Sequence, residues 1–308
     1  MLLRGVAMIS RRQFLRFGVP LAGALAGGVS LWRDGLAADI APDGAADGDA
    51  RRYLIVNADD LGLDAGVNRG IFETHVRGIL TSASLMVTGR AVEEAAREAR
   101  RHPRLSVGIH VDLLHMDRQT LRTDFDAVAV EVERQMDVFR EVTGRLPTHI
   151  DSHHHLHRRY NVAHVFLEAS RRHGLPLRGF SDIVFNGGFW GQSPDGSPDG
   201  SRISADALIR LALGIGPGLT VLSCHPGYCE PGPPDAYGRA RETEIRALTD
   251  PRVRRAIEDA GITLVSHADY PRLSPVIARA RSRRRATAAS GRRRPVGSSR
   301  PTRAPAGP

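Results

Sequence analysis

The sequence is poor in cysteine. Its 308 residues include only two, Cys224 and Cys229. Two thiolates alone would leave a zinc ion short of ligands, and a single pair cannot form a disulfide framework, so both kinds of cysteine site are excluded. One bridge between the two residues is compatible with an oxidising compartment, while two free thiols near a loop is the simpler interpretation.

Several catalytic signatures are also absent from the sequence. It contains no glycine-rich phosphate loop, no Gly-x-Ser-x-Gly nucleophile elbow and no His-Glu-x-x-His helix. These motifs are typical of P-loop enzymes, serine esterases and zincin metalloproteases, respectively. The chain is therefore expected to belong to none of these three classes.

Acidic side chains are missing from the end of the chain. Residues 272–303 include eleven arginines and no acid, and residues 1–38 carry five arginines against one aspartate. Because the net charge of the whole chain is only +9, the part between these ends is negative. A nucleic-acid groove would need clustered basic residues on one face. We therefore expect no nucleic-acid partner, and an acidic body suits carboxylates around a cation.

The first residues are typical of an export signal. Residues 10–16 (SRRQFLR) match the twin-arginine pattern, residues 17–32 are apolar and uncharged, and small residues follow at 35–38. An amphipathic helix start or a membrane anchor is the alternative, but the apolar stretch is slightly short for a stable span. We therefore predict a signal peptide at 1–38, a linker at 39–51, and export to the periplasm or beyond through the twin-arginine pathway.

The last residues have a composition that disfavours a packed structure. Residues 272–308 are mostly Arg, Ser, Ala and Pro, with few large apolar side chains. Such a segment buries too little surface to offset its ordering entropy. We predict a disordered, solvated tail, with contact to an anionic surface as the alternative.

Short apolar runs alternate with helical patterns from 52 to 271. This alternation predicts a parallel sheet of about seven strands in an α/β fold, either an irregular (β/α) barrel-like fold or a doubly wound sheet. Strands are expected at 53–57, 81–87, 105–111, 148–152, 175–179 (weak), 219–224 and 262–266. Helices are expected at 68–76, 91–101, 124–143, 162–173, 205–213, 236–248 and 251–259.

Polar residues follow several of these strands at the point where each ends. Asp59 and Asp60 follow the first strand, and His110 lies at the end of the third. Residues 151–157 follow the fourth strand, and His225 comes directly after the strand that ends at Cys224. The carboxyl ends of parallel strands meet at one rim. We therefore expect these residues to form one site.

The segment 149–157 (HIDSHHHLH) is the most distinctive local pattern. In an extended chain alternate residues share a face. One face would then carry His149, Asp151, His153, His155 and His157. A catalytic metal usually has three protein ligands and one position for water, so some of these residues must orient ligands or contact substrate.

The residue types at this rim fit hydrolysis with a metal-activated water. An aspartate with two histidines suits zinc or another first-row ion, whereas magnesium prefers more oxygen. Asp59 would take the proton of the water, and His225, exposed by a Pro-Gly turn, is a candidate general acid. Considered alone, the Asp59-Asp60 pair could instead cap a helix, and His110 could be a core histidine.

Five segments carry a resemblance to a known family, the YdjC-like carbohydrate deacetylases of the ChbG/HpnK type. They are YLIVNADDLG, GILTSASLMVTG, VGIHVDL, PTHIDSHHHLH and LSCHPGY. The resemblance runs from Tyr53 to about Tyr270 and implies a barrel-like fold, with magnesium as the usual metal of the family. It implies metal ligands at Asp60, His110 and His153, the base at Asp59, and a later Arg-x-x-Glu helix containing Arg241 and Glu244.

These features predict a metal-dependent hydrolase that removes acetyl groups from N-acetylated sugars, with one divalent cation. We assign substrate contacts to His155, His157 and Arg241. The substrate could be a chito-oligosaccharide, a peptidoglycan fragment or a glycolipid, and a homodimer is compatible with the sequence. Another metal hydrolase, such as a phosphoesterase, and a non-catalytic exported metal- or sugar-binding protein are the alternatives. A pure binder would not need the spare carboxylate of Asp59.

Overall fold

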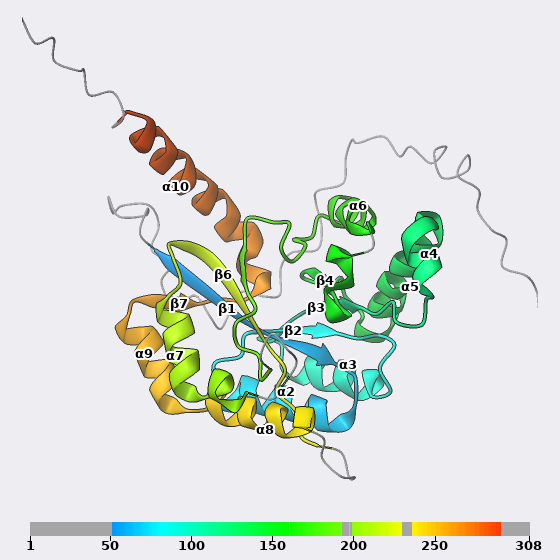
Figure 1. Cartoon of the computed structure of the whole chain (residues 1–308), viewed down its shortest axis with the longest axis horizontal. Helices are drawn as coiled ribbons and strands as arrows, with labels where there is room; N and C mark the ends of the chain where they lie inside the picture. The colour runs from blue at the N-terminus through cyan, green and yellow to red at the C-terminus, as the bar shows by residue number, and fades with distance from the viewer. Residues whose placement is uncertain (1–50, 160, 193–196, 198, 230–235, 291–308) are drawn as a thin grey trace, which may run out of the picture. The chain divides into compact units, whose positions relative to one another are not determined.

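A curved parallel sheet forms the centre of the protein (Figure 1). The computed structural model describes residues 51–159, 161–192, 197, 199–229 and 236–290. The seven strands are β1 (Arg52–Leu61), β2 (Ser82–Leu85), β3 (Ser106–Val111), β4 (Ile150–Ser152), β5 (Val184–Asn186), β6 (Gly218–Cys224) and β7 (Ile262–Leu264). Their order is β4-β3-β2-β1-β6-β5, and β7 pairs with the start of β1. The sheet curls as a half-barrel, which confirms the predicted barrel-like α/β fold.

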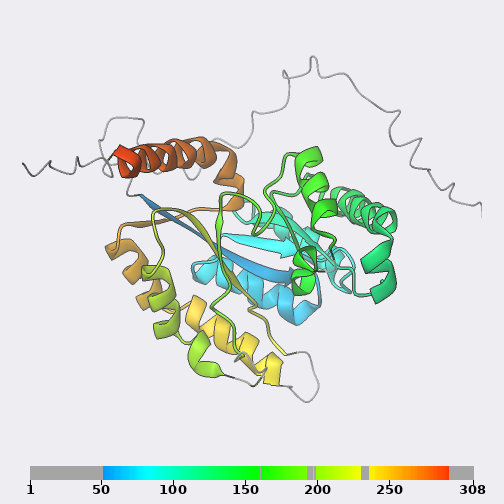
Figure 2. The same cartoon turned by 45° about the horizontal axis from the view of Figure 1, so that its top comes forward.

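Helices connect the strands and pack around the sheet (Figure 2). Helix α2 packs against α8, α3 against α5, α5 against α6, and α7 against α9. The helices are α2 (Ala65–Arg77), α3 (Val92–Arg101), α4 (Arg118–Thr123), α5 (Phe125–Thr143), α6 (Ala163–His173), α7 (Ala205–Leu213), α8 (Ala236–Leu248), α9 (Pro251–Asp259) and α10 (Tyr270–Ser290). Short 3-10 turns are η1 (His153–Arg158), η2 (Gly200–Ile203) and η3 (His267–Asp269).

Strand β1 is the central strand and is buried along almost its whole length. It pairs with β6 from Arg52 to Ala58 and with β2 from Asn57 onward. On the far side of β2, His110 of β3 lies opposite Asp151 of β4. Because all these pairs are parallel, the strands end at one rim, as the sequence predicted.

Helix α5 follows from its sequence. The Asp124 carboxylate accepts a hydrogen bond from the Ala127 backbone N–H and caps the helix start. Gly144 adopts the left-handed conformation that ends it. Its buried apolar stripe comprises Val128, Val132, Met136 and Phe139.

The weak strand predicted at 175–179 is not formed. Leu177 makes only an isolated bridge to Ile150, and the strand lies further along, at Val184–Asn186. Pro176 has no N–H to donate to a ladder, and Gly179 adopts a positive φ of 75°. These two residues explain why pairing does not continue.

The chain after residue 271 differs from the predicted disordered tail. Helix α10 continues to Ser290, because arginine and alanine favour helix and because its first turns are anchored. Leu273 and Ile277 are buried, and the Tyr270 hydroxyl donates to the Asp182 carboxylate at 2.5 Å. The rest of the predicted tail, residues 291–308, lies outside the described residues. So do residues 1–50, which include the predicted signal peptide and most of the predicted linker.

Two smaller expectations concern cysteine and the membrane. Cys224 is buried at the end of β6, and neither it nor Cys229 forms a disulfide, which agrees with the simpler interpretation. Among the helices that the structure describes, none has the length and apolar character needed to cross a bilayer.

Truncation of Phe139 should destabilise the protein. Phe139 is fully buried in α5, so we expect Phe139→Ala to lower the free energy of unfolding by about 3–5 kcal/mol. Val130, on the same helix, is 70% exposed, so Val130→Ala should change it by less than about 0.5 kcal/mol. Denaturant unfolding monitored by circular dichroism measures both. Equal losses would contradict the assigned core face of α5.

Candidate active site

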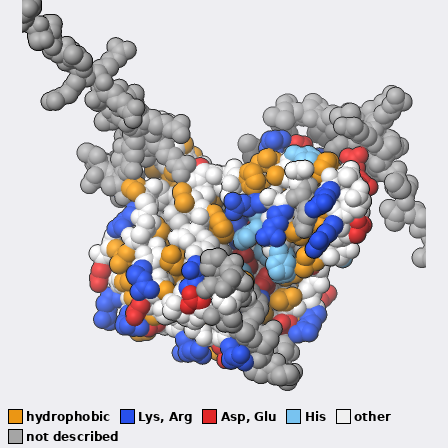
Figure 3. All heavy atoms as spheres, in the orientation of Figure 1, with side chains coloured by type: hydrophobic (Ala, Val, Ile, Leu, Met, Phe, Trp, Pro, Cys, Tyr) orange, Lys and Arg blue, Asp and Glu red, His pale blue; other side chains and the backbone are white. Residues whose placement is uncertain are grey.

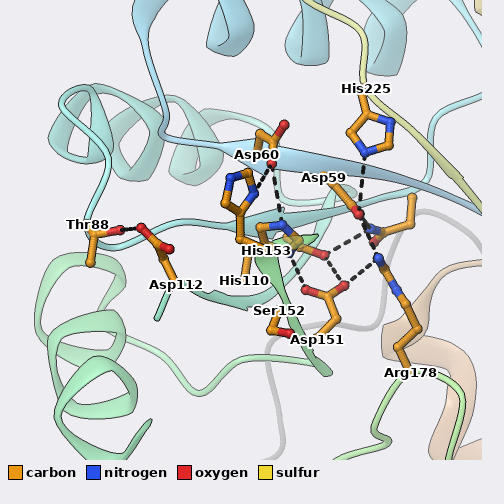
Figure 4. A network of polar contacts seen from close by, with 12 residues as sticks. Asp59, Asp60, Thr88, His110, Asp112, Asp151, Ser152, His153, Arg178 and His225 are labelled. Carbon is orange, nitrogen blue, oxygen red and sulfur yellow. Dashed lines mark hydrogen bonds and ion pairs between the residues drawn. The ribbon is translucent and has the colours of Figure 1, made fainter. Parts of the chain in front are cut away.

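The predicted polar residues do meet at the carboxyl rim of the sheet (Figure 4). Asp59 and Asp60 lie near the end of β1, His110 in β3, and His225 directly after β6. They are joined there by His153, which begins η1. Residues far apart in the sequence thus form one buried cluster.

Asp60, His110 and His153 form a set that could hold a metal ion. Asp60 Oδ1 lies 3.2 Å from His153 Nδ1 and 3.4 Å from His110 Nε2. All three ligand atoms lie within 4.8 Å of one another. Asp60 adopts a positive φ of 68°, which is unusual for a residue other than glycine and is often found at functional sites. Two imidazole nitrogens and one carboxylate oxygen, all largely buried, fit a divalent cation.

Asp151 orients the candidate ligand His110. His110 Nδ1 and Asp151 Oδ1 are 2.6 Å apart, and this contact turns Nε2 toward Asp60. Metal-binding histidines commonly have such a carboxylate behind them. Burial alone would lower the pKa of His110, but the charges of Asp151, Asp60 and Asp59 outweigh it and raise the pKa to about 10. The cluster therefore has an excess of negative charge.

Arg178 holds Asp59 in place. Its guanidinium donates to both Asp59 oxygens at 2.6 Å, and Asn57 Nδ2 donates to Oδ1 at 2.9 Å. Burial would raise the pKa of Asp59, but Arg178 outweighs this effect and lowers it. Asp59 is therefore an ionised acceptor with a fixed orientation. Arg178, which also contacts Asp151, was not predicted from the sequence.

The histidine tract does not line one face as predicted. The chain is extended only to Ser152, and it then turns through η1, where His154 and His155 have positive φ values of 52° and 53°. The turn directs His153 toward Asp60 and leaves His154 exposed. The alternating pattern of a strand therefore ends at Ser152, directly before the candidate ligand His153.

His157 is a buried residue with partners inside the protein, and its contact with substrate stays a prediction. It is fully buried, its Nδ1 accepts from the Ser152 hydroxyl at 2.7 Å, and its Nε2 lies 3.1 Å from the backbone carbonyl of Arg178. Both ring nitrogens are thus used within the protein. His157 supports the loop that carries Arg178.

Helix α8 fixes both His225 and Asp60. The His225 backbone N–H donates to Glu244 at 2.5 Å, and its carbonyl accepts from Arg241 at 3.3 Å. Arg241 also donates to Asp60 Oδ2 at 2.5 Å. Arg241 is buried, and its role in substrate binding stays a prediction. Because Arg241 and Glu244 are one turn apart, the same helix positions both Asp60 and the backbone of His225.

The ring of His225 lies beside Asp59. Its Nε2 is 3.8 Å from Asp59 Oδ2, and the ring packs against Trp190 with 4.5 Å between ring centroids. Burial lowers the pKa of His225 to about 4, so the ring is neutral near pH 7. Burial likewise raises the pKa of Glu244 to about 8. The ring can therefore accept a proton before donating it.

His155, another predicted substrate contact, has a ring nitrogen without a hydrogen-bond partner in the described part of the chain. It is half-buried and packs edge-on against Phe185 at 5.3 Å. Among the described residues its Nδ1 has no hydrogen-bond partner. Figure 3 shows histidine side chains gathered in a hollow of the surface, with basic side chains beside them. The unpartnered Nδ1 of His155 is itself buried, so its contact with a sugar stays a prediction.

The chain has clear relatives among known proteins. It is 34% identical over 253 residues to a carbohydrate deacetylase of Geobacillus stearothermophilus, a match covering 72% of this chain and 99% of the relative. It is 29% identical to a chitooligosaccharide deacetylase of Serratia marcescens, covering 71% and 99%. A crystal structure from Enterococcus faecalis, provisionally named a cellobiose-phosphate cleavage protein, matches with a TM-score of 0.59 and 25% identity, covering 71% and 98%. A family model described as YdjC-like protein matches residues 53–259, so the chain belongs to the YdjC-like family.

Proposed function

We propose that the protein is a metal-dependent carbohydrate deacetylase that removes acetyl groups from N-acetylated sugars. The observation that carries this proposal is the pairing of two sites at one rim. A buried Asp60–His110–His153 set adjoins an ionised carboxylate, Asp59, that has a histidine, His225, 3.8 Å away. The names of relatives in the same family, as carbohydrate and chitooligosaccharide deacetylases, support the same activity.

Asp60, His110 and His153 would hold the cation. The second oxygen of Asp60 is already bonded to Arg241, so Oδ1 remains for a metal. The donor set of two nitrogens and one oxygen favours zinc, while the family resemblance favours magnesium. When bound, the cation would polarise the acetyl carbonyl and lower the pKa of a bound water.

The surrounding residues would move the protons. Asp59 accepts the proton of the attacking water, and Arg178 keeps the carboxylate oriented for that transfer. His225 Nε2, near the same carboxylate, takes this proton from Asp59 and passes it to the sugar nitrogen as the C–N bond breaks. The water oxygen leaves in acetate, and the sugar leaves as a free amine.

A phosphoesterase with two metals is the second candidate. Asp59, His110 and Asp151 also have ligand atoms within 4.8 Å of one another. However, Arg178 already pairs with both Asp59 and Asp151, and a cation there would have to displace its guanidinium. The one-metal deacetylase is therefore favoured, with a chito-oligosaccharide, a peptidoglycan fragment or a glycolipid as substrate and His155 as a sugar contact.

We also propose that the protein is exported. The proposal rests on the sequence of residues 1–38, in which a twin-arginine motif precedes an apolar stretch and small residues. The twin-arginine route carries folded proteins, so the metal could be acquired before export.

Removal of one proposed ligand should abolish metal binding and turnover together. We expect metal-free wild type to regain acetate release from N-acetyl chito-oligosaccharides or muropeptides when zinc or magnesium is added. His153→Ala should regain none at the same metal concentration. The matched control is His164→Ala, which removes an exposed ring that packs against Phe125 away from the cluster, and it should bind metal like the wild type. Equal metal affinity in all three proteins would rule out the assigned ligand.

Substitution of the proposed base should separate binding from chemistry. Asp59→Asn keeps the shape of the side chain but cannot take a proton, so we expect kcat to fall by about 10²–10⁴. Zinc affinity, measured by competition with a chelator, should fall far less than in His153→Ala, because Asp59 is not a proposed ligand. Asp112→Asn serves as control. Asp112 lies on the loop after β3, and its carboxylate accepts hydrogen bonds from the Thr88 hydroxyl and the Leu114 backbone N–H. Full turnover in Asp59→Asn would exclude it as the base.

The export signal can be tested apart from the enzyme. Residues 1–51 fused to a reporter that folds in the cytoplasm should deliver it to the periplasm. Replacement of Arg11 and Arg12 by lysine should retain it in the cytoplasm, as cell fractionation would detect. Twin-arginine export would be refuted if the lysine variant delivered the reporter as well as the unaltered segment. It would also be refuted if the unaltered segment delivered none.

A further inference from the structure

A buried polar chain extends behind the candidate metal cluster. Asp151 Oδ1 contacts His110, and Asp151 Oδ2 accepts a hydrogen bond from the Ser84 hydroxyl at 2.7 Å. Ser84 Oγ in turn lies 2.9 Å from Asn57 Nδ2 and 3.0 Å from His149 Nε2. All five residues are buried, so this chain connects His149 to the metal ligand His110 without an exposed link.

The number of protons on Ser84 fixes the direction of these bonds. A serine hydroxyl has one proton to donate and two lone pairs that accept. Ser84 donates its proton to Asp151, whose carboxylate can only accept. Its lone pairs therefore accept from Asn57 Nδ2 and from His149 Nε2. Hence His149 must carry its proton on Nε2.

The other side of the His149 ring agrees with this assignment. Nδ1 lies 3.0 Å from the Thr148 hydroxyl, which can donate to it. Burial lowers the pKa of His149 to about 4, which keeps the ring neutral with a single N–H. Each polar atom of the ring then has a partner of the right kind.

The ring of His149 has a fixed place between two neighbours. It stacks on His267 with 3.6 Å between ring centroids and 17° between the planes. On the strand β3, a Cβ at Gly108 would lie 2.3 Å from His149 Cε1 and Nδ1. Only glycine leaves room for the ring at this position. Strand β3, through Gly108, and the turn η3, through His267, thus fix the ring of His149 with its Nε2 beside Ser84.

We propose that His149 is a positioning residue for the metal site: its Nε2–H, through Ser84, orients Asp151 and so holds His110 in line with Asp60. Asp151 also contacts Arg178, which clamps Asp59. The chain from His149 therefore supports both the metal ligand and the base. This inference rests on the proposed function, because it assumes that Asp60, His110 and His153 bind the metal.

The tautomer of His149 can be tested without any substitution in the measured protein. Long-range ¹H–¹⁵N correlation spectra of the metal-free full chain distinguish a protonated from an unprotonated ring nitrogen. The His149 signals are identified by their loss in His149→Gln. We expect a protonated Nε2 and an unprotonated Nδ1. A protonated Nδ1 with a bare Nε2 would overturn the proposal.

Two substitutions at the same position test the effect on metal binding. His149→Leu removes the donor, whereas His149→Gln provides an amide N–H that can reach Ser84. Both lose the ring stacked on His267, so the comparison isolates the donated hydrogen bond. We expect leucine to weaken zinc binding by about 10- to 100-fold and glutamine by less than about threefold, as measured by chelator competition on folded protein.

His153→Ala is the reference that separates the two possible failures. If it binds zinc as tightly as the wild type, the proposed metal site is wrong and the inference fails with it. If it loses zinc while His149→Leu binds like the wild type, the metal site stands and the positioning role is overturned. The role is likewise overturned if glutamine weakens binding as much as leucine.

Discussion

The balance of buried negative charge is the constraint on which the site depends. Three aspartates, Asp59, Asp60 and Asp151, are buried close together at the rim of the sheet. Arg178 pairs with Asp59 and Asp151, and Arg241 pairs with Asp60, so two arginines face three carboxylates and one negative charge is left over. Uncompensated charge in a buried site is costly, so the excess negative charge favours a proton on a nearby histidine or a bound cation. A metal site follows from the charge balance as well as from the ligand types.

The same constraint separates the roles of two adjacent residues. Asp59 has both oxygens bonded to Arg178 and is thereby fixed as an acceptor, whereas Asp60 keeps one oxygen directed at two imidazoles. The positive φ of Asp60 turns the second carboxylate away from the line of the strand. Helix α8 completes the arrangement, since Arg241 reaches Asp60 and the peptide of His225. The proposed base, metal ligands and proton donor are therefore held by one connected set of contacts.

The sequence predicted those parts of the site that have a local signal. The strand ends that carry Asp60 and His110 were predicted because each strand is a short apolar run that can be recognised from neighbouring residues. Arg178 was not, because its partner Asp59 lies 119 residues away and a lone arginine in a loop carries no pattern. The position of His157 depended on a turn that interrupts the strand periodicity. Helix α10 was missed because composition alone understated the helix propensity of arginine and alanine.

The central claim is that Asp60, His110 and His153 bind one divalent cation at the rim. Anomalous X-ray diffraction from crystals of the zinc-loaded protein tests it most directly. We expect a single strong peak within coordination distance of one Asp60 oxygen and one nitrogen of each histidine, with Arg178 still paired to Asp59. A peak between Asp59 and Asp151 with Arg178 displaced, or no ordered zinc at this rim, would contradict the account.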